Sequence, residues 1–424
     1  MRFVSFVTLM ALLVLGLAFA QDEGWPDLTG ESIRVAGVWT GDGQRDFETV
    51  LASFEELTGA SVEFFSTGDD IATVVGTQIE GGNPPDVAML PQPGLLVEFA
   101  QRGALVPVED VAGELVDANF APVWRELGSV DGELYGVWLK AANKSLLWYN
   151  ADLLDEFGIE APTTWEEFLA AAGAVHDFGL TQISVGAGSA WTLTDWFENV
   201  YIHVAGPELY DQLTYREIPW THDSVKESLT KLTEIWRHEW LSGGLQATLE
   251  ANHGTGVTRP FAEPPAAAFA YGADFSAGGI QNETNAELGT TARFVPFPSI
   301  DGSPPAVVGG GDVAVMLRDN EAARALIRYF AMPDSAEVWA ALGGYTSPNQ
   351  AVDLAVYPTD INRATAEALA QAETFRFDMS DLQPSAFGGT PAQGLFGILV
   401  EFLQDHDVDK AAEALEEAAE AAHR

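Results

Sequence analysis

The stretch of residues 140–168 constrains the fold more than any other part of this chain. A strand-type apolar run precedes it, and the same pattern resumes at 146–149. Asn150 then opens a short helical pattern that Gly158 closes, and residues 162–167 set a helix cap followed by first-turn acids. An extended segment that leads straight into newly capped helices is typical of a chain crossing from one lobe into the next. The sequence therefore predicts a hinge here.

Short strand-like runs alternate with helical patterns in the hundred residues before this hinge. The strand-like runs are 33–39, 62–65 and 86–90. The helical patterns that follow them are 47–57, 71–79 and 94–102. Three consecutive strand–helix units predict an α/β fold with a parallel sheet.

The length of the chain predicts two domains. Its 424 residues exceed what one hydrophobic core usually serves. A second apolar crossing is expected at 306–317, which contains three consecutive glycines, and a third at 343–348. We expect an N-terminal lobe of residues 31–141 plus 312–345. The C-terminal lobe would then comprise residues 142–308 plus 346–424.

Residues 1–20 have the pattern of a secretory signal peptide. Arg2 precedes an apolar run over 7–19, and Ala18-Phe19-Ala20 forms a small-x-small cleavage site before Gln21. A membrane anchor is the alternative, but the run is shorter than the ~20 residues that span a bilayer. The chain has no cysteine, hence no lipid-carrying cysteine to tether it. We therefore expect a periplasmic protein without stable membrane insertion.

The charge balance excludes several classes of partner. The chain carries 63 acidic and 20 basic residues, a formal net charge of −43. DNA, RNA and anionic lipid all require a basic face, so none of them is an expected partner. The acids indicate a solvated acidic surface, which would also suit a saline habitat where salt screens self-repulsion.

Seven sequence stretches, in order along the chain, resemble the extracellular solute-binding proteins, family 1, of ABC sugar importers. Their likeness is greatest to the periplasmic α-glucoside-binding proteins. The stretches are VWTGDGQRDFE from Val38, GNPPDVAMLPQPGLL from Gly82, NKSLLWYN from Asn143, PTTWEEF from Pro162, TDWFEN from Thr194, GPELYDQLTYREIPWT from Gly206 and TFRFDMSDLQP from Thr374.

The resemblance implies a fold, a function and a set of partners. The fold would be the two-lobed periplasmic binding protein fold, type II-like, with a ligand cleft between lobes joined by crossing segments. Such a protein captures a carbohydrate, here an α-glucoside or related oligosaccharide, by hinge closure. It then delivers the sugar to the transmembrane permease subunits of an ABC importer. The resemblance implies a monomer that is not an enzyme and that holds neither a cofactor nor a metal.

The cleft of this architecture lies outside the carboxyl ends of the strands, which selects the loops 40–44, 66–70 and 91–93. A sugar offers an apolar C–H face and a ring of hydroxyls, so its site needs flat aromatics and directional polar groups. The stacking candidates are Trp39, Trp191 and Trp196. In a chain with 12 Trp and 24 Phe, the default role of each is core packing.

The polar candidates come from these loops, the crossings and the late TFRFDMSDLQP stretch. They are Asp42, Asp69, Asp70, Gln92, Lys140, Asp195, Asp312, Tyr345, Arg376 and Asp378. The loop aspartates have an alternative role in turn formation or helix capping. The alternative role of Arg376 is an interlobe salt bridge. Small residues over 268–275, and Asp312 after the triple glycine, depart from the α-glucoside group. The sequence therefore leaves open a ligand other than a simple disaccharide.

Other functions remain as alternatives. A glycoside hydrolase needs two carboxyl groups roughly 5–10 Å apart in one cleft, which a chain with 63 acids supplies by chance. Within the same fold, a polyamine or a glycerol-type solute stays open as the ligand. The acids of 405–416 have the spacing of a calcium loop, but Lys410 stands where glycine is needed. Asp409 is instead expected to cap a helix.

Overall fold

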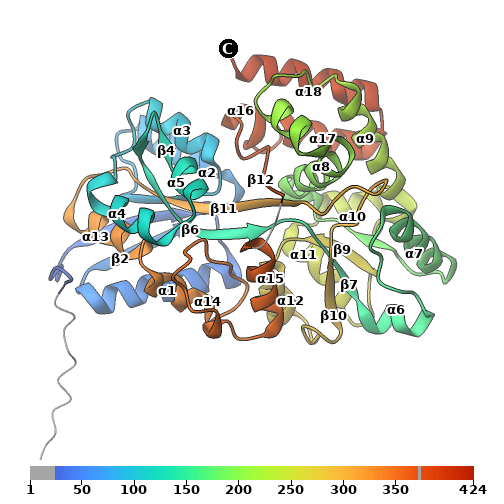
Figure 1. Ribbon diagram of the computed structural model, residues 1–424, viewed down its shortest axis with the longest axis horizontal. Helices are drawn as coiled ribbons and strands as arrows, with labels where there is room; N and C mark the ends of the chain where they lie inside the picture. The colour runs from blue at the N-terminus through green and yellow to red at the C-terminus, as the bar shows by residue number, and fades with distance from the viewer. Residues whose placement is uncertain (1–23, 371–373) are drawn as a thin grey trace, which may run out of the picture.

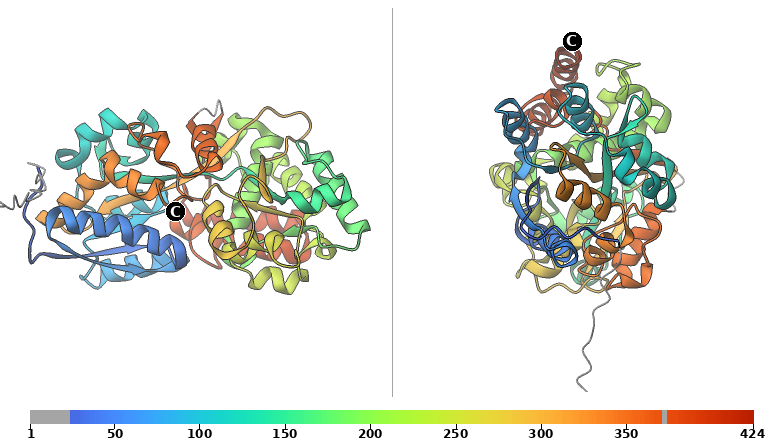
Figure 2. Two further views of the ribbon diagram at one scale, coloured as in Figure 1. Left: turned by 90° about the horizontal axis from the view of Figure 1, so that it is seen from below. Right: turned by 90° about the vertical axis from the view of Figure 1, so that its left-hand side faces the viewer.

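The computed structural model describes residues 24–370 and 374–424 and consists of two α/β lobes, connected by strands that run from one to the other (Figure 1). The view from below shows the same two lobes (Figure 2). The expected signal peptide lies outside the described residues. Within the described residues, no helix is both long and apolar enough to span a bilayer.

The sheet of the first lobe contains the predicted parallel strands. β1 (Ser32–Gly37) pairs in parallel with both β2 (Ser61–Ser66) and β3 (Val87–Leu90). The full strand order is β12-β11-β3-β1-β2, and β6 pairs with β11 on its own. The predicted strand–helix units are thus confirmed. The helices of this lobe are α1 (Gly41–Thr58), α2 (Ile71–Glu80), α3 (Pro93–Gln101), α4 (Glu109–Asn119), α5 (Pro122–Leu127), α13 (Glu321–Phe330) and α14 (Pro333–Ala340).

The first helix begins earlier than its apolar spacing predicted. α1 starts at Gly41 rather than near Phe47, because polar residues 41–46 continue the helical turn ahead of the apolar stripe. Asp42 therefore lies in the first turn of α1 and not in a loop. Residues 68–70, expected as loop, form the short 3-10 helix η1 (Gly68–Asp70).

The second lobe is built on a four-stranded sheet in the order β10-β7-β9-β8. Its strands are β7 (Leu146–Asn150), β8 (Ile183–Ser184), β9 (Phe269–Gly272) and β10 (Ala292–Pro296). Its helices are α6 (Ala151–Phe157), α7 (Trp165–Asp177), α8 (Trp191–Thr214), α9 (Asp223–Ile235), α10 (Gly244–Glu250), α11 (His253–Thr258), α12 (Ser276–Glu283), α16 (Ser385–Gly388), α17 (Gly394–Asp405) and α18 (Val408–Ala422). The remaining short elements are β4 (Ser129–Val130), β5 (Glu133–Leu134), η2 (Ala187–Ser189), η3 (His238–Trp240), η4 (Arg259–Phe261) and η5 (Leu354–Val356).

The helix caps expected after the hinge are present. The side chain of Asn150 accepts a hydrogen bond from the backbone N–H of Leu153 at the start of α6. Thr164 and Glu167 form a reciprocal capping box at the start of α7. At the other end of the chain, Asp407 and not Asp409 caps α18. Asp409 lies in the first turn instead, because the helix begins two residues earlier than expected.

Two long strands make the crossing between the lobes. β6 (Gly136–Asn143) and β11 (Val307–Met316) pair antiparallel along most of their length (Figure 1). β6 leads into β7 of the second lobe, and β11 continues into the first sheet beside β3. The predicted crossing over 140–168 begins within β6, and the predicted crossing at 306–317 coincides with β11.

The third crossing lies later in the chain than expected. Tyr345, Tyr357 and Ala366 all pack in the first hydrophobic core, so the chain does not leave that lobe at 343–348. It leaves through β12 (Phe375–Phe377), which pairs with β11, and Met379 already packs in the second core. α15 (Asp360–Ala370) precedes it. The full division into lobes stays a prediction, because core membership alone does not define a rigid unit.

Candidate ligand site between the lobes

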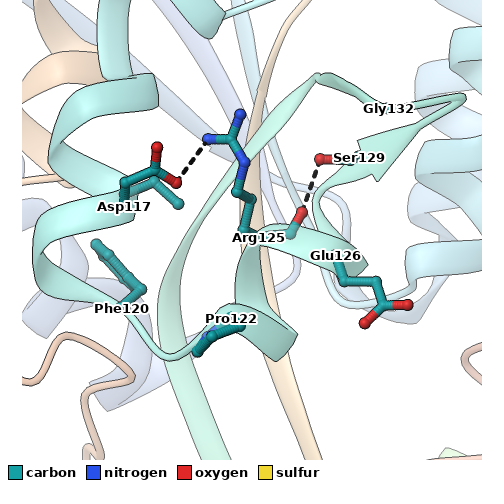
Figure 3. Close-up of a pocket in the computed structure, with 8 residues that line it drawn as sticks. Asp117, Phe120, Pro122, Arg125, Glu126, Ser129 and Gly132 are labelled. Atoms are coloured by element: carbon teal, nitrogen blue, oxygen red, sulfur yellow. Dashed lines mark hydrogen bonds and ion pairs between the residues drawn. The ribbon is translucent and has the colours of Figure 1, made fainter.

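A surface depression of the first lobe has a volume of about 420 Å³. It lies between α4, α5 and the β4–β5 hairpin and contains none of the predicted site residues (Figure 3). Arg125 extends across it to Asp117 at 3.1 Å, and the hydroxyl of Ser129 donates to the carbonyl of Arg125. The depression is therefore part of a surface ion-pair region, apart from the crossing strands.

An aromatic cage encloses the side chain of Lys140 on crossing strand β6. Its Nζ lies 4.6 Å from the ring centre of Phe275, 5.5 Å from that of Trp339 and 5.8 Å from that of Trp39. Trp39 follows β1, Trp339 lies on α14, and Phe275 precedes α12 of the second lobe. We call these three rings the aromatic cage. Because it takes rings from both lobes, the cage marks where the lobes meet.

Asp312 lies beside Lys140 on the neighbouring crossing strand. The two residues are register partners between β6 and β11, at a point where the register shifts. Directly opposed residues on antiparallel strands present their side chains on the same face. Burial raises the pKa of Asp312, while the charges of Lys140 and Lys144 act in the opposite direction. The crossing strands thus carry a buried carboxyl group next to a buried ammonium group.

The wall contributed by the second lobe is formed by Trp191, His253 and Phe275. The ring of Trp191 lies 4.8 Å from that of His253 and 6.2 Å from that of Phe275. Burial, together with the charges of Lys140 and Lys144, lowers the pKa of His253 to about 3. His253 is therefore neutral at physiological pH and serves as a flat polar ring, with Nε2 3.2 Å from the hydroxyl of Ser276.

A charged cluster lies directly behind Trp191. Nζ of Lys144 is 2.5 Å from Asp378, 3.3 Å from Asp195 and 3.4 Å from Asp381, and it lies 5.5 Å from the centre of the Trp191 ring. We call these four residues the Lys144 cluster. Gly310 makes room for it, because a Cβ there would meet the side chain of Lys144. Lys144 follows β6, Asp195 lies on α8, and the other two follow β12, so the cluster joins three segments distant in sequence.

The carboxyl groups of the Lys144 cluster differ in protonation. Burial lowers the pKa of Lys144, but the negative charges of Asp195, Asp378 and Asp381 outweigh this effect. The pKa of Lys144 therefore lies well above its ordinary value. Burial alone would raise the pKa of Asp378, yet Lys144 and neighbouring hydrogen bonds hold it well below its usual range. Burial raises the pKa of Asp195 well above its ordinary value, and it raises that of Asp381 to about 8. One lysine therefore holds one carboxylate fully ionised while its neighbours retain protons more readily.

The structure brings seven of the thirteen predicted site residues to this region. Trp39, Lys140 and Asp312 belong to the cage and its strands, and Tyr345 supports it by stacking on Trp339 at 5.1 Å. Trp191 forms the opposite wall, and Asp195 lies behind it in the Lys144 cluster. Asp378 is the seventh, as the closest partner of Lys144. Their roles in binding stay a prediction.

Three predicted residues have structural partners elsewhere. Trp196 is 1% exposed in the second core, between Tyr271 and Phe297, and so lies away from the cleft. The guanidinium of Arg376 donates to Asp211 of α8 at 2.5 Å, which matches the salt-bridge alternative. Gln92 is buried at the N-terminus of α3, where its amide packs against Gly389.

The remaining three aspartates lie at the edge of the first lobe. Asp42 forms an ion pair with Arg45 in the first turn of α1. Asp70 is exposed and precedes α2, in the capping position expected as its alternative role, although its side chain makes no cap hydrogen bond. Burial raises the pKa of Asp69, and the hydroxyl of Ser189 in the second lobe opposes this. Of the three, Asp69 is thus the one that faces the other lobe.

The fold also brings here several residues that were not predicted from the sequence, above all Lys144, His253, Phe275 and Trp339. Lys144 lies within the NKSLLWYN stretch, directly at the predicted crossing, and a buried lysine is rare enough to have been a signal. Phe275 ends the stretch of small residues at 268–275. His253 and Trp339 carry no local signal, since only the packing of distant elements places their rings against the crossing strands.

Comparisons with known proteins place this geometry in context. The sequence model of the family described as bacterial extracellular solute-binding proteins matches residues 40–337. The osmoprotective compounds-binding protein GgtB of Synechocystis sp. is 34% identical over 92% of this chain and 93% of its own length. The alpha-glucosides-binding periplasmic protein AglE of Rhizobium meliloti is 31% identical over 85% of this chain and 82% of its own.

Solved structures agree on the fold. The bacterial solute receptor AcbH, which prefers b-D-galactopyranose, superposes with a TM-score of 0.80 over 93% of this chain and 100% of its own at 16% identity. A chitin oligosaccharide binding protein superposes with a TM-score of 0.79 over 92% and 98% at 20% identity. At these identities the likeness shows the fold alone, and it confirms the predicted two-lobed periplasmic binding protein fold.

Proposed function

Because the chain belongs to the family of bacterial extracellular solute-binding proteins, we propose that it captures a small carbohydrate between its lobes and delivers it to the permease of an ABC importer. One observation carries this proposal. Flat aromatic rings from both lobes, Trp39 and Trp339 on one side and Trp191 and Phe275 on the other, converge on polar groups of the crossing strands. This combination matches a ligand with apolar C–H faces and many hydroxyls.

Two classes of ligand compete within this proposal. One similar relative binds osmoprotective compounds and another binds α-glucosides, at nearly the same identity to this chain. Both descriptions are compatible with a short glucoside whose partner is a sugar or a glycerol-type polyol. The enclosed cage favours such a short ligand over a long oligosaccharide, since both lobes pack around the single side chain of Lys140.

Capture would proceed by closure of the lobes about the crossing strands. A ligand that contacts both aromatic walls binds the closed arrangement better than the open one and shifts the equilibrium toward it. Lys140 lies on the strand that passes between the lobes, so a ligand bound against Lys140 would contact both aromatic walls at once. The permease would then recognise the closed form.

The export and assembly of the protein follow from the same proposal. The chain would be exported through the signal peptide at residues 1–20 and work in the periplasm as a monomer without a lipid anchor. Periplasmic fractionation tests the location, and the mass of the purified protein in solution tests the assembly.

A binding role without catalysis is part of the proposal. Glycoside hydrolysis needs an acid and a base that both face the glycosidic bond. The carboxyl groups behind Trp191, those of Asp195 and Asp378, are instead bound to Lys144. Purified protein incubated with aryl glycosides is expected to release no product, and release would contradict this part of the proposal.

A panel of ligands tests the function directly. Maltose, sucrose, trehalose, a glucosylated glycerol, spermidine and glycine betaine would each be added during thermal unfolding. A bound ligand at about a hundred times its Kd adds about 2.7 kcal/mol to the free energy of unfolding, which raises Tm measurably. We expect at least one neutral glucoside to do so. Stabilisation by spermidine or glycine betaine alone would contradict the proposal.

A further inference from the structure

The aromatic cage has the form of a cation-binding site, yet the protein itself fills it. Rings of Trp, Tyr or Phe arranged within about 6 Å of a positive charge are the usual means of binding quaternary ammonium ligands. Here the charge belongs to Lys140, whose Nζ lies 4.6 to 5.8 Å from the centres of three rings. A second cation in the same place would meet both a filled cage and a like charge.

The polar groups at this point are unused by the protein. Among the described residues, Nζ of Lys140 has no hydrogen bond and no ion pair, although the side chain is only 7% exposed. The carboxylate of Asp312, also 7% exposed, accepts no hydrogen bond from the residues that the structure describes. An ammonium group offers three donors and a carboxylate only acceptors. Within the described part of the chain, these polar atoms have no protein partner and are not fully shielded from solvent, so they are available to a ligand that enters between the lobes.

Other nearby acids do not take this role. Burial raises the pKa of Asp274, and the charge of Lys140 opposes this rise. The oxygens of Asp274 already accept hydrogen bonds, however, from the hydroxyl of Thr346 and from the backbone N–H groups of Asn143 and Phe275. Burial also raises the pKa of Asp46, which lies half-buried on α1, and the charge of Lys140 again opposes the rise. Asp312 is the acid that shares both the register position and the strand face of Lys140.

We propose that Lys140 and Asp312 are a selectivity pair that admits an uncharged, hydroxyl-bearing ligand and rejects quaternary ammonium compounds and polyamines. A hydroxyl both accepts and donates, so one hydroxyl, or two on adjacent carbons, joins the ammonium of Lys140 to the carboxylate of Asp312. The ring of Trp191 in the opposite wall then covers the C–H groups beside it. A quaternary ammonium ligand has no hydroxyl on its charged group to make this bridge. This inference rests on the proposed function and names its substrate class.

Matched variants test the pair. Lys140→Met keeps a chain of similar length within the cage but removes the charge, and Asp312→Asn keeps the shape of the carboxyl group. Lys410→Met, at an exposed lysine of α18, is the control. Calorimetric titration with the tightest neutral glycoside of the panel is expected to give a Kd raised at least tenfold for each cleft variant. That loss is of the order expected for a hydrogen bond to a charged group. The control should leave Kd unchanged.

The unliganded Tm of each variant checks folding, and Lys140→Gln replaces Lys140→Met if the latter fails to fold. A Kd within twofold of the wild type for Lys140→Met and Asp312→Asn would overturn the inference while leaving the proposed function intact. Stabilisation of the wild type by glycine betaine or spermidine would overturn the rejection of quaternary ammonium compounds and polyamines. If the wild type binds no neutral glycoside at all, the proposed function fails, and this inference fails with it.

Discussion

Single residues in the cleft divide into those that pack the protein and those left for a ligand. Trp191 and Trp196 are five residues apart on one helix, yet the first is half-buried beside His253 and the second is enclosed in the core. The backbone turns their side chains to different faces of α8. A pair of tryptophans with the same chemistry therefore offers a direct comparison between binding and stability.

Replacing each tryptophan by alanine should separate these roles. We expect Trp191→Ala to weaken binding of the neutral glycoside at least tenfold, about 1.4 kcal/mol, with a nearly unchanged unliganded Tm. Trp196→Ala should instead lower the free energy of unfolding by about 3–5 kcal/mol, because it empties a large buried volume. Titration calorimetry and denaturant unfolding measure the two quantities. A large stability loss in Trp191→Ala would assign that residue to the core.

The Lys144 cluster predicts a specific dependence of stability on pH. Burial raises the pKa of Asp381 to about 8 in the folded protein, against about 3.9 in an unfolded chain. Between those values the folded state binds a proton that the unfolded state has released. The free energy of unfolding should therefore fall as pH rises from about 4 to about 8, by at most ~1.4 kcal/mol per pH unit for one proton. Above pH 8 this contribution levels off.

Asp381→Asn removes that titration and should flatten the dependence of Tm on pH between 5 and 8. Asp195 contributes in the same direction, because burial also raises its pKa, so part of the slope should persist. Asp360→Asn, at an exposed carboxylate of α15, is the control and should keep the full slope. An identical slope in Asp381→Asn and the wild type would show that Asp381 is ionised throughout this range.

At the scale of elements, the crossing through β12 makes close backbone contact with the first lobe. The backbone N–H of Gly94 in α3 donates to the carbonyl of Asp381 at 2.9 Å. A Cβ at Gly94 would collide with the backbone carbonyl of Gln383. The segment after β12 is therefore held between the helix α3 of one lobe and the helix α8 of the other, which bears Asp195 and Glu198.

Adding one methyl group at Gly94 tests this contact. Gly94→Ala should lower the free energy of unfolding by about 1–3 kcal/mol, because backbone and not a flexible side chain must move. Gly173→Ala is the matched control, since Gly173 lies within α7 with no atom within 4 Å of the added Cβ. There alanine should raise the free energy of unfolding by up to about 1 kcal/mol through its higher helix propensity. Equal stability of the two variants would contradict the close contact.

The whole molecule is dominated by negative charge. A net charge of −43 on 424 residues makes the folded state repel itself, and added salt screens that repulsion. We expect Tm to rise when NaCl is increased from 0.1 to 1 M, and KCl to have the same effect. A Tm that stays constant or falls would show that the acids are locally compensated. The Kd for a neutral glycoside should change little over the same range, since no ion pair with the ligand is involved.

The sequence by itself determined the elements that local chemistry specifies. Alternating strand and helix patterns gave the parallel strands of the first lobe, and the polar caps after Asn150 and Thr164 are local hydrogen bonds within a few residues. The motifs spread along the chain also placed it in its family and fold. Apolar spacing alone missed the polar first turn of α1, because a helix can begin before its buried face does.

Only the tertiary structure decided which side chains meet. Lys144 contacts Asp195, which is 51 residues away in the sequence, and Asp378, which is 234 residues away. No local pattern encodes such a pairing. The same holds for the cage, where Trp39, Phe275 and Trp339 gather around Lys140. A short polar or aromatic motif is equally compatible with a core, a cap or a cleft. The choice depends on which distant elements pack against it, and here the crossing strands β6 and β11 make that choice.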